Sequence, residues 1–437
     1  MDYKEKAHFL TEILKLGEKR DRQCMVGVEI EHIVVDKNSW NSIHYYQKDG
    51  IETILKKLMR FAYKPKFEGD SLIGLEHEDY IITLEPGGQL EISIRPCSSL
   101  KKIELIYFQF LQQVIPILEE QNQFLMALGY HPKSTIADIP FIPKKRYQLM
   151  SAYLKEKGKY AHNMMKGTAS LQISIDYYDE EDFIKKMRVA HFLSPVLAVI
   201  SDNAPIFEGK DYEQNSLRSL IWQNTDPARS GTIPGVMDQS FGYQEYADYL
   251  LNVEPILFLK DDRALSAGNR KISDLLDQYV FTVPELEHLF SMVFPDARAK
   301  NYIEIRTGDS LPHPFSFSYI AFIKGLFYNQ AALDYLFQLT ETVDSETLEK
   351  YKQSMIQKGL KGDFASKTLI DFLPPLFDWA REGLPVEEIH YLQPLENLIL
   401  SQENVLHRTR EKLDKEGLDG LRSCILNDLI QEECLSC

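Results

Sequence analysis

Short segments in which apolar and polar residues alternate are the feature that most restricts the fold of this chain. Residues 24–35 read CMVGVEIEHIVV, and the segments 89–95 (QLEISIR), 171–177 (LQISIDY) and 301–306 (NYIEIR) alternate in the same way. A period of two is typical of a strand with one buried and one polar face, whereas buried parallel strands read as near-continuous apolar runs. The pattern therefore predicts an antiparallel sheet with one polar face, and an α+β fold rather than a doubly wound α/β fold.

Turn residues and helical spacing place the other elements around this sheet. Pro86-Gly87-Gly88 lies between the strand-like segments 80–84 and 89–95, which predicts an antiparallel hairpin. Helical periodicity predicts helices over residues 3–20, 51–62, 99–122, 180–201 and 244–251. From about residue 316 nearly every segment has helical spacing. We expect one unit spanning residues 1–437, with the sheet in residues 1–315 and a helical region at 316–437 packed on it.

Each of three segments of the predicted sheet carries acidic residues on its polar face. The first strand carries Glu29 and Glu31, and the hairpin carries Glu85 at its turn and Glu91 on its second strand. The last strand carries Glu304 and Arg306 on one face. Carboxylate oxygens on rigid strands suit Mg²⁺, a hard cation that commonly shares its ligands with substrate phosphates. The alternative is that the glutamates line a solvated face, and the residues alone leave both interpretations open.

Basic residues gather in a long loop and next to the last strand. Residues 202–243 are rich in Asp, Asn, Pro and Gly and predict a loop around a short segment at 217–222, and long loops are usually functional. The loop carries Arg218 and Arg229, and Arg298 and Lys300 precede the last strand. Because arginine makes two-point contacts with carboxylates and phosphates, these positions indicate anionic ligands. Surface ion pairing is the alternative.

The overall charge and hydropathy exclude several classes of protein. The net charge of −16 repels phosphate backbones, so we expect no binding to nucleic acid. No apolar run approaches the ~18 residues of a membrane span, and the N-terminal residues lack a signal-peptide core. We therefore expect a cytoplasmic protein without a membrane partner.

Motifs for nucleophilic or zinc chemistry are missing. The chain has no phosphate-binding P-loop, no G-x-G-x-x-G, no G-x-S-x-G and no H-E-x-x-H. Its 5 cysteines are too few and too scattered for a disulfide framework. Cys434 and Cys437 have the spacing of a zinc-ligand pair, but a chain terminus is a poor place for one. We expect ordinary reduced cysteines.

A set of motifs in sequence order resembles glutamate–cysteine ligase of the plant and proteobacterial type. The motifs are Gly27–Glu31 (GVEIE), Leu84–Glu91 (LEPGGQLE), Pro143–Tyr147 (PKKRY), Met164-Met165, Thr168–Asp176 (TASLQISID), Arg218–Trp222 (RSLIW), Thr225–Gly231 (TDPARSG), Phe241–Tyr243 (FGY) and Phe294–Arg306 (FPDARAKNYIEIR). The match runs from about residue 20 to 315. The chain departs from the family pattern at Ile30 and His32, where His and Lys are frequent, and at Ala169, where Cys is frequent. No acidic or arginine position of the clusters is affected.

The resemblance implies a fold similar to glutamine synthetase: a curved antiparallel sheet whose concave face holds metal and substrates, with helices outside. It also implies that ATP phosphorylates the γ-carboxylate of glutamate and that the amino group of cysteine attacks the acyl phosphate. The product would be γ-glutamylcysteine, in the first step of glutathione or related thiol synthesis. A different acceptor amine, or a ligand-binding protein without catalysis on the same fold, stays open. The sequence does not indicate an oligomeric state.

The residues and the resemblance together assign roles to individual side chains. Mg²⁺ on the phosphates of ATP, the co-substrate, is expected to bind Glu29, Glu91 and Glu304, with Glu31 and Glu85 as further ligands. Charge on the transferring phosphoryl group is expected to be stabilised by Arg306 and Lys300. The expected substrate-binding residues are Arg218, Arg229, Trp222 and Gln172.

Overall fold

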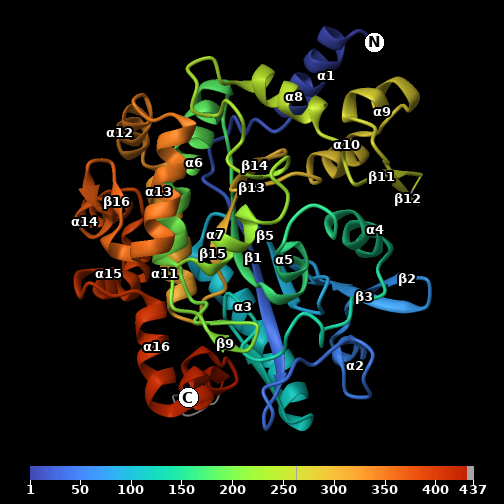
Figure 1. The fold of residues 1–437 in the computed structure, drawn as a ribbon, viewed down its shortest axis with the longest axis vertical. Helices are drawn as coiled ribbons and strands as arrows, with labels where there is room; N and C mark the ends of the chain where they lie inside the picture. Colours follow the sequence, from blue (N-terminus) through green and yellow to red (C-terminus); the bar gives the residue numbers. More distant parts are fainter. Residues whose placement is uncertain (262, 431–437) are drawn as a thin grey trace.

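The alternating segments pair in one antiparallel sheet that runs through the middle of the chain's fold (Figure 1). The structure is a computed structural model and describes residues 1–261 and 263–430. Within these residues the strand order is β14-β15-β7-β1-β5-β4-β3-β2, and β6 pairs with the far part of β1. The strands of this sheet are β1 (Val26–Asp36), β2 (Lys64–Glu68), β3 (Ser71–Glu76), β4 (Tyr80–Leu84), β5 (Leu90–Cys97), β6 (Gln123–Met126), β7 (Ser170–Ile175), β14 (Ala297–Ala299) and β15 (Ile303–Asp309).

All pairings of the sheet are antiparallel, so the predicted α+β class is confirmed. The predicted hairpin is formed by β4 and β5, with Glu85–Gln89 at the turn. The peripheral strand pairs in the described residues are β8 (Ile206–Phe207) with β9 (Lys210–Asp211), β10 (Ser230–Gly231) with β13 (Phe294–Pro295), β11 (Leu257–Lys260) with β12 (Arg263–Ser266), and β16 (Asp363–Phe364) with β17 (Lys367–Thr368).

Helices surround the sheet and include those that the spacing predicts. Two long ones begin at side-chain caps: Ser99 accepts a hydrogen bond from the amide of Lys102 at the start of α3, and Asp179 accepts one from Asp182 at the start of α6. The α-helices of the described residues are α1 (Tyr3–Lys15), α2 (Ile51–Leu58), α3 (Leu100–Glu120), α4 (Lys145–Leu154), α5 (Ala161–Gly167), α6 (Glu180–Ile200), α7 (Leu217–Gln223), α8 (Tyr243–Asn252), α9 (Ile272–Gln278), α10 (Val283–Phe290), α11 (Phe315–Tyr328), α12 (Gln330–Thr340), α13 (Ser345–Lys358), α14 (Leu369–Glu382), α15 (Gln393–Leu400) and α16 (Val405–Glu416). No described helix combines the length and apolar character needed to cross a membrane.

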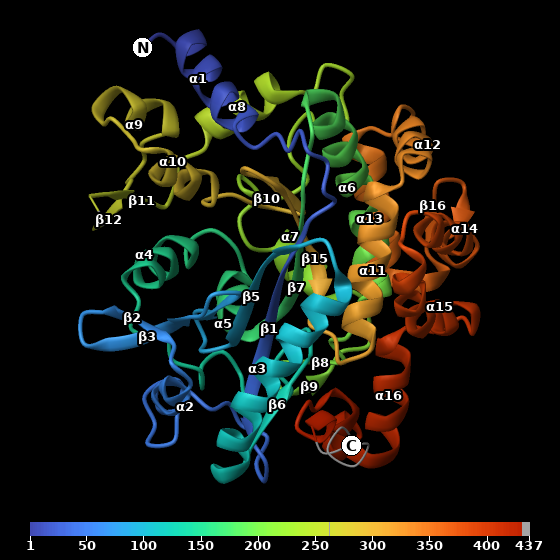
Figure 2. The same ribbon diagram turned by 180° about the vertical axis from the view of Figure 1, so that it is seen from behind.

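Packing against α3 distinguishes the two sides of β1. His32 stacks on Tyr107 of α3 with 5.8 Å between ring centroids, and its Nε2 lies 2.8 Å from the Tyr107 hydroxyl. Figure 2 shows α3 lying across this side of the sheet. Because successive side chains of a strand point to opposite faces, Glu29 and Glu31 point to the other side. The alternation therefore places the carboxylates on the face opposite α3.

The C-terminal helices pack onto the same body. Beyond residue 315 the described chain is mainly helical, as the spacing predicts, with β16 and β17 as a short exception. Helix α11 contacts α3 and β7, and residues of both parts of the chain share one hydrophobic core. A division at residue 315 within one unit stays a prediction.

The described cysteines are free, and two cysteines cannot be placed. Cys24, Cys97 and Cys424 carry free thiols. Cys434 and Cys437, which have the spacing of a ligand pair, lie outside the described residues.

Candidate active site

A cavity opens on the sheet face opposite α3, between the strands and the helices α4, α5 and α7. One side carries the carboxylates of Glu29, Glu31, Glu85 and Glu91. The guanidinium groups at the cavity are those of Arg146, Arg218, Arg298 and Arg306. Apolar lining comes from Met150, Met164, Met165, Trp222 and Phe294. The cavity therefore places negative and positive groups in one partly apolar space.

The strand register brings the glutamates of β1 and β5 together. Glu31 pairs with Glu91 across the two strands, so both side chains lie on the same face. Glu31 accepts hydrogen bonds of 2.7 Å from both the amide and the hydroxyl of Ser170. Glu91 accepts bonds of 2.8 Å from Thr83 and 2.6 Å from Ser93. These polar neighbours hold the carboxylates in place without neutralising their charge.

The crowded carboxylates hold their protons more tightly than free glutamates. Burial, with the charges of Glu304 and Glu91, raises the pKa of Glu29 to about 8. Burial and the charges of Glu85 and Glu91 raise the pKa of Glu31 to about 8. Burial and the charge of Glu85 raise the pKa of Glu91 to about 7. A cation placed among them would relieve this repulsion.

The donors present fit a hard cation that takes part of its shell from a substrate. Among the described residues, no three His, Cys, Asp or Glu side chains stand close enough to enclose a metal ion by themselves. Mg²⁺ usually binds through one or two carboxylates and fills its other positions with water and substrate phosphate. The four glutamates at the cavity satisfy that smaller requirement.

Glu304 differs from the other four glutamates because cations surround it. Its Oε2 accepts hydrogen bonds of 2.5 Å from Arg298 and 2.7 Å from Arg306, and Lys300 Nζ lies 3.4 Å from its Oε1. Burial alone would raise the pKa of this carboxyl, yet the three cations together lower it well below its ordinary value. The structure thus places Glu304 among cations, and its predicted role as a metal ligand stays a prediction.

Arg306, Gln172 and Trp222 are brought together as predicted. Arg306 donates a hydrogen bond of 2.5 Å to Gln172 Oε1, and Gln172 Nε2 donates one of 3.2 Å to Glu31. The guanidinium of Arg306 lies over the ring of Trp222, 5.9 Å from its centroid. Gln172 therefore links the arginine side of the cavity to the carboxylate side.

Lys300 stands at the edge of this group. Its ammonium contacts Glu304 and lies over the ring of Tyr302, 4.6 Å from the centroid. Burial lowers its pKa, although the nearby carboxylates of Glu304 and Glu29 act in the opposite direction. Lys300 thus contacts Glu304, which in turn binds the cavity residues Arg298 and Arg306.

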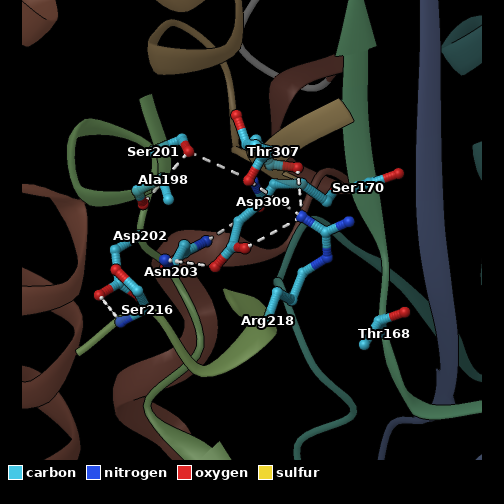
Figure 3. A network of polar contacts seen from close by, with 12 residues as sticks. Thr168, Ser170, Ala198, Ser201, Asp202, Asn203, Ser216, Arg218, Thr307 and Asp309 are labelled. Atoms are coloured by element: carbon cyan, nitrogen blue, oxygen red, sulfur yellow. Dashed lines mark hydrogen bonds and ion pairs between the residues drawn. The ribbon is translucent and has the colours of Figure 1, made fainter. Parts of the chain in front are cut away.

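Arg218 contacts the cavity and also holds the end of β15 (Figure 3). It donates hydrogen bonds of 2.8 Å to the carbonyl of Gly308 and 3.2 Å to that of Thr307, and it lies 3.5 Å from Asp309. Asp309 in turn accepts a bond of 2.8 Å from the amide of Asn203. The register of β15 shifts in this stretch, so Arg218 braces an irregular strand end. Its Nε is buried and has no hydrogen-bond partner within the described chain.

The structure does not bring Arg229 to this cavity. Its guanidinium is buried and donates to Asp226 at 2.6 Å, to the carbonyl of Met292 at 3.0 Å, to the Tyr153 hydroxyl at 2.6 Å and to the carbonyl of Glu254 at 2.9 Å. With its donors engaged by the protein, Arg229 joins loop segments. Arg229 thus lies outside this cavity, and its predicted role in substrate binding stays a prediction.

Two cavity arginines had no role assigned from the sequence. Arg146 lines the cavity at the start of α4, and its Nε is buried without a hydrogen-bond partner in the described chain. Arg298 lines the cavity and binds Glu304. The basic run Lys144–Arg146 in an acidic chain was a usable signal for the first. The sequence placed Arg298 among the basic residues that indicate anionic ligands, but it gave no specific role.

A second and larger cavity of about 540 Å³ continues along the sheet. Glu29 lines both cavities, and Gly27, Pro96 and Tyr302 line the second. At Gly27 an added Cβ would stand 3.3 Å from the Cβ of Ser174, so the floor of this cavity is tight against the neighbouring strand. Glu29 thus marks the junction of a polar site with a roomier cavity.

Comparison with known proteins identifies the family. The model of glutamate-cysteine ligase family 2 (GCS2) matches residues 25–400, which contain all the residues described above as lining the first cavity. The chain belongs to glutamate-cysteine ligase family 2. This confirms the resemblance seen in the sequence and the predicted activity: the chain is an ATP-dependent glutamate–cysteine ligase.

Plant members of the ligase family are similar to this chain over most of their length. It is 30% identical over 383 residues to the chloroplastic glutamate–cysteine ligase of Nicotiana tabacum, covering 86% of this chain and 73% of that one. It is 31% identical over 396 residues to glutamate–cysteine ligase B, chloroplastic, of Oryza sativa subsp. japonica, covering 88% and 79%. The prediction of a cytoplasmic location is wrong, because these relatives are chloroplastic.

Solved ligase structures share the fold at low sequence identity. A glutamate–cysteine ligase from Francisella tularensis in complex with AMP has a TM-score of 0.57 and 13% identity, covering 92% of this chain and 87% of that one. A bifunctional glutathione synthetase from Pasteurella multocida has a TM-score of 0.51 and 13% identity, covering 98% and 54%. At this identity the likeness concerns the fold.

Proposed function

We propose that the cavity over β1, β5, β7 and β15 is where the ligase couples glutamate to cysteine. The observation that carries this proposal is the meeting of four carboxylates with four guanidinium groups in one cavity. A ligase of this kind must bring together a polyanionic nucleotide and a carboxylate substrate, which needs both a metal site and free cations. The product would enter glutathione or related thiol synthesis. Residues 1–315 and 316–437 would act as one unit.

Mg²⁺ is the cation that these donors fit, with one or two of the carboxylates of Glu29, Glu31, Glu85 and Glu91 as its protein ligands. The raised pKa values of three of these glutamates indicate negative charge that the protein itself does not compensate. When bound, Mg²⁺ supplies neutralisation of charge on the ATP phosphates. The strand register and the hydrogen bonds from Thr83, Ser93 and Ser170 keep Glu31 and Glu91 in position for this role.

ATP would extend across the junction at Glu29. Its base and ribose fit the second cavity beside Gly27 and Tyr302, and its phosphates would then reach Glu29 and the first cavity. Arg306 and Lys300, together with Arg298, would face the transferring phosphoryl group. Phosphoryl transfer depends on positioning and on the stabilisation of charge, which agrees with the missing nucleophile motifs.

The reaction has two balanced steps. An oxygen of the glutamate γ-carboxylate attacks the γ-phosphorus of ATP, the bond to the bridging oxygen breaks, and ADP leaves. The amino nitrogen of cysteine then attacks the acyl carbon, phosphate leaves and the amine loses a proton. The guanidinium groups of Arg306 and Arg218 would hold the anionic oxygens during these steps.

Glutamate would be held by the basic and apolar side of the cavity. Arg146 offers a guanidinium without a bound carboxylate, and Trp222 and Gln172 flank the place where Arg306 enters. We infer that Arg146 pairs with a carboxylate of glutamate. Arg229 lies outside this cavity, and four protein groups already accept hydrogen bonds from its guanidinium.

Arg146 and Arg229 form a matched pair for a test of substrate binding. Arg146→Lys keeps the charge but loses the two-point geometry, so we expect KM for glutamate to rise about 10-fold or more with little change in melting temperature. Arg229→Lys should lower the melting temperature and leave KM for glutamate within about threefold, because it removes buried bonds outside the cavity. Steady-state kinetics and thermal melting of both variants decide the matter. A rise in KM for glutamate only in Arg229→Lys would reverse the assignment.

Product analysis tests the proposed reaction. Glutamate labelled with ¹⁸O in its γ-carboxylate is incubated with ATP, Mg²⁺ and, in parallel, cysteine or other amines. We expect γ-glutamylcysteine, ADP and phosphate carrying ¹⁸O, detected by mass spectrometry. AMP with pyrophosphate would contradict the acyl-phosphate route, and a γ-glutamyl product only with another amine would contradict the choice of cysteine.

A further inference from the structure

A buried lysine of the C-terminal helices reaches the core next to the active site. Lys352 on α13 has a side chain that is 8% exposed, and its Nζ lies 2.5 Å from Asp296 Oδ2 and 2.7 Å from Thr232 Oγ1. The Asp296 carboxylate also accepts a hydrogen bond of 3.1 Å from Ser194 on α6. An ion pair this far from water is costly unless it is well paired, so its presence calls for an explanation.

Asp296 is coupled through its backbone to the catalytic strand. Its carbonyl accepts a hydrogen bond of 2.9 Å from the amide of Arg306, and its amide donates one of 2.9 Å to Gly231. Asp296 lies between β13 and β14, directly before the segment that carries Arg298. The turn around Asp296 therefore sets the backbone position of both arginines that bind Glu304.

A small cavity of about 40 Å³ confirms that these groups are neighbours. Lys352, Asp296, Arg306 and Trp222 all line it. Three of the four belong to segments that the resemblance singled out, whereas Lys352 belongs to a region in which the sequence shows no motif. Lys352 thus brings a side chain of the C-terminal helices to the cavity lined by Arg306 and Trp222.

We propose that Lys352 is a positioning residue, which fixes the Asp296 turn and thereby the place of Arg306 in the active site. This inference rests on the proposed role of Arg306 in phosphoryl transfer. Lys352 does not touch substrate. Its ammonium and the Ser194 hydroxyl both donate to Asp296 Oδ2 and fix this side chain, so the Asp296 carbonyl stays aligned with the Arg306 amide.

The test compares Lys352→Met with Lys352→Arg and with Lys350→Met. Lys350 lies on the same helix, is 69% exposed and pairs only with Glu346 in the described chain, so it is a matched control. We expect Lys352→Met to lower kcat by about 10- to 100-fold, because small misplacements of catalytic groups have effects of that size. KM for ATP should stay within about threefold of the wild-type value. Lys352→Arg should recover most of kcat, and Lys350→Met should equal the wild type.

Hydrogen exchange gives a readout that does not depend on activity. Mass spectrometry of peptides covering residues 303–309 should show faster amide exchange in Lys352→Met, with peptides from α3 unchanged. Should Lys352→Met not fold, the double variant with Asp296→Asn, which leaves no unpaired buried charge, is measured in the same two assays.

The outcomes separate this inference from the proposed function. Wild-type kcat in Lys352→Met, or a lower kcat with unchanged exchange over residues 303–309, would overturn the positioning role. If the wild-type protein forms no γ-glutamylcysteine, the proposed function fails. The exchange of residues 303–309 then still decides whether Lys352 fixes the strand.

Discussion

Glu29→Gln and Glu91→Gln should each lower kcat by about 100-fold or more, since each removes a hard anionic ligand while keeping the size of the side chain. The melting temperature should not fall, and it should rise where the wild-type carboxylate is charged. The reason lies in the crowding of the carboxylates: burial and neighbouring charges raise the pKa of Glu29 to about 8 and that of Glu91 to about 7. Removing one charge lowers the repulsion between carboxylates in the folded state, but it also removes a ligand of Mg²⁺.

The same pKa shifts give the sign of a pH dependence. A carboxyl whose pKa is raised in the folded state favours folding while it is protonated, and it loses that contribution as pH rises toward the folded pKa. Without Mg²⁺, we expect these groups to lower the melting temperature of the wild-type protein between about pH 5 and pH 8. Glu29→Gln should flatten this decline. Mg²⁺ with ATP should stabilise the wild-type protein more at pH 8 than at pH 6.

An exposed glutamate of the same sheet region controls for the substitution itself. Glu78 lies on the surface between β3 and β4, so Glu78→Gln should change neither kcat nor the pH dependence. Kinetics over a Mg²⁺ series and melting curves from pH 5 to pH 9 test the three variants together. Near wild-type turnover in both Glu29→Gln and Glu91→Gln would contradict the metal site.

The carboxylate side of the site could be predicted from sequence because strands impose a strict geometry. A period of two puts Glu29 and Glu31 on one face, and the tight turn at residues 86–88 fixes the β4–β5 register that sets Glu91 opposite Thr83. The polar alternation likewise predicted antiparallel pairing. Strand alternation and turn formation depend on a few neighbouring residues, so they can be predicted from a single sequence.

The arginine side depended on contacts between distant segments. Arg229 and Arg218 lie in similar loop sequence, yet Tyr153 and Glu254 engage the first, and the second reaches the cavity. Arg146 lines the cavity because α4 packs over the sheet. No local sequence pattern predicts where α4 packs. Lys352 meets Asp296 from 56 residues away along the chain. Tertiary packing decides these cases, and residue type alone does not.

Arg306→Lys should lower kcat by about 100- to 1,000-fold, the size of effect expected when a preorganised donor to developing charge is lost. Arg306 contacts Gln172 and Glu304 at once and lies over Trp222, so its guanidinium plane is fixed before substrate arrives. Lysine keeps one positive charge near Glu304 but offers a point charge on a flexible stem. KM for ATP should therefore change much less than kcat.

Stability separates a catalytic role from a structural one for Arg306. Glu304 still contacts Arg298 and Lys300 in the variant, so the melting temperature should fall only slightly. Arg408→Lys on the exposed surface of α16 is the matched control and should leave kcat unchanged. If Arg306→Lys raised KM for glutamate and left kcat intact, Arg306 would be a substrate anchor. Arg298 and Lys300, which both contact the buried carboxylate of Glu304, would then be the cations that stabilise charge on the phosphoryl group.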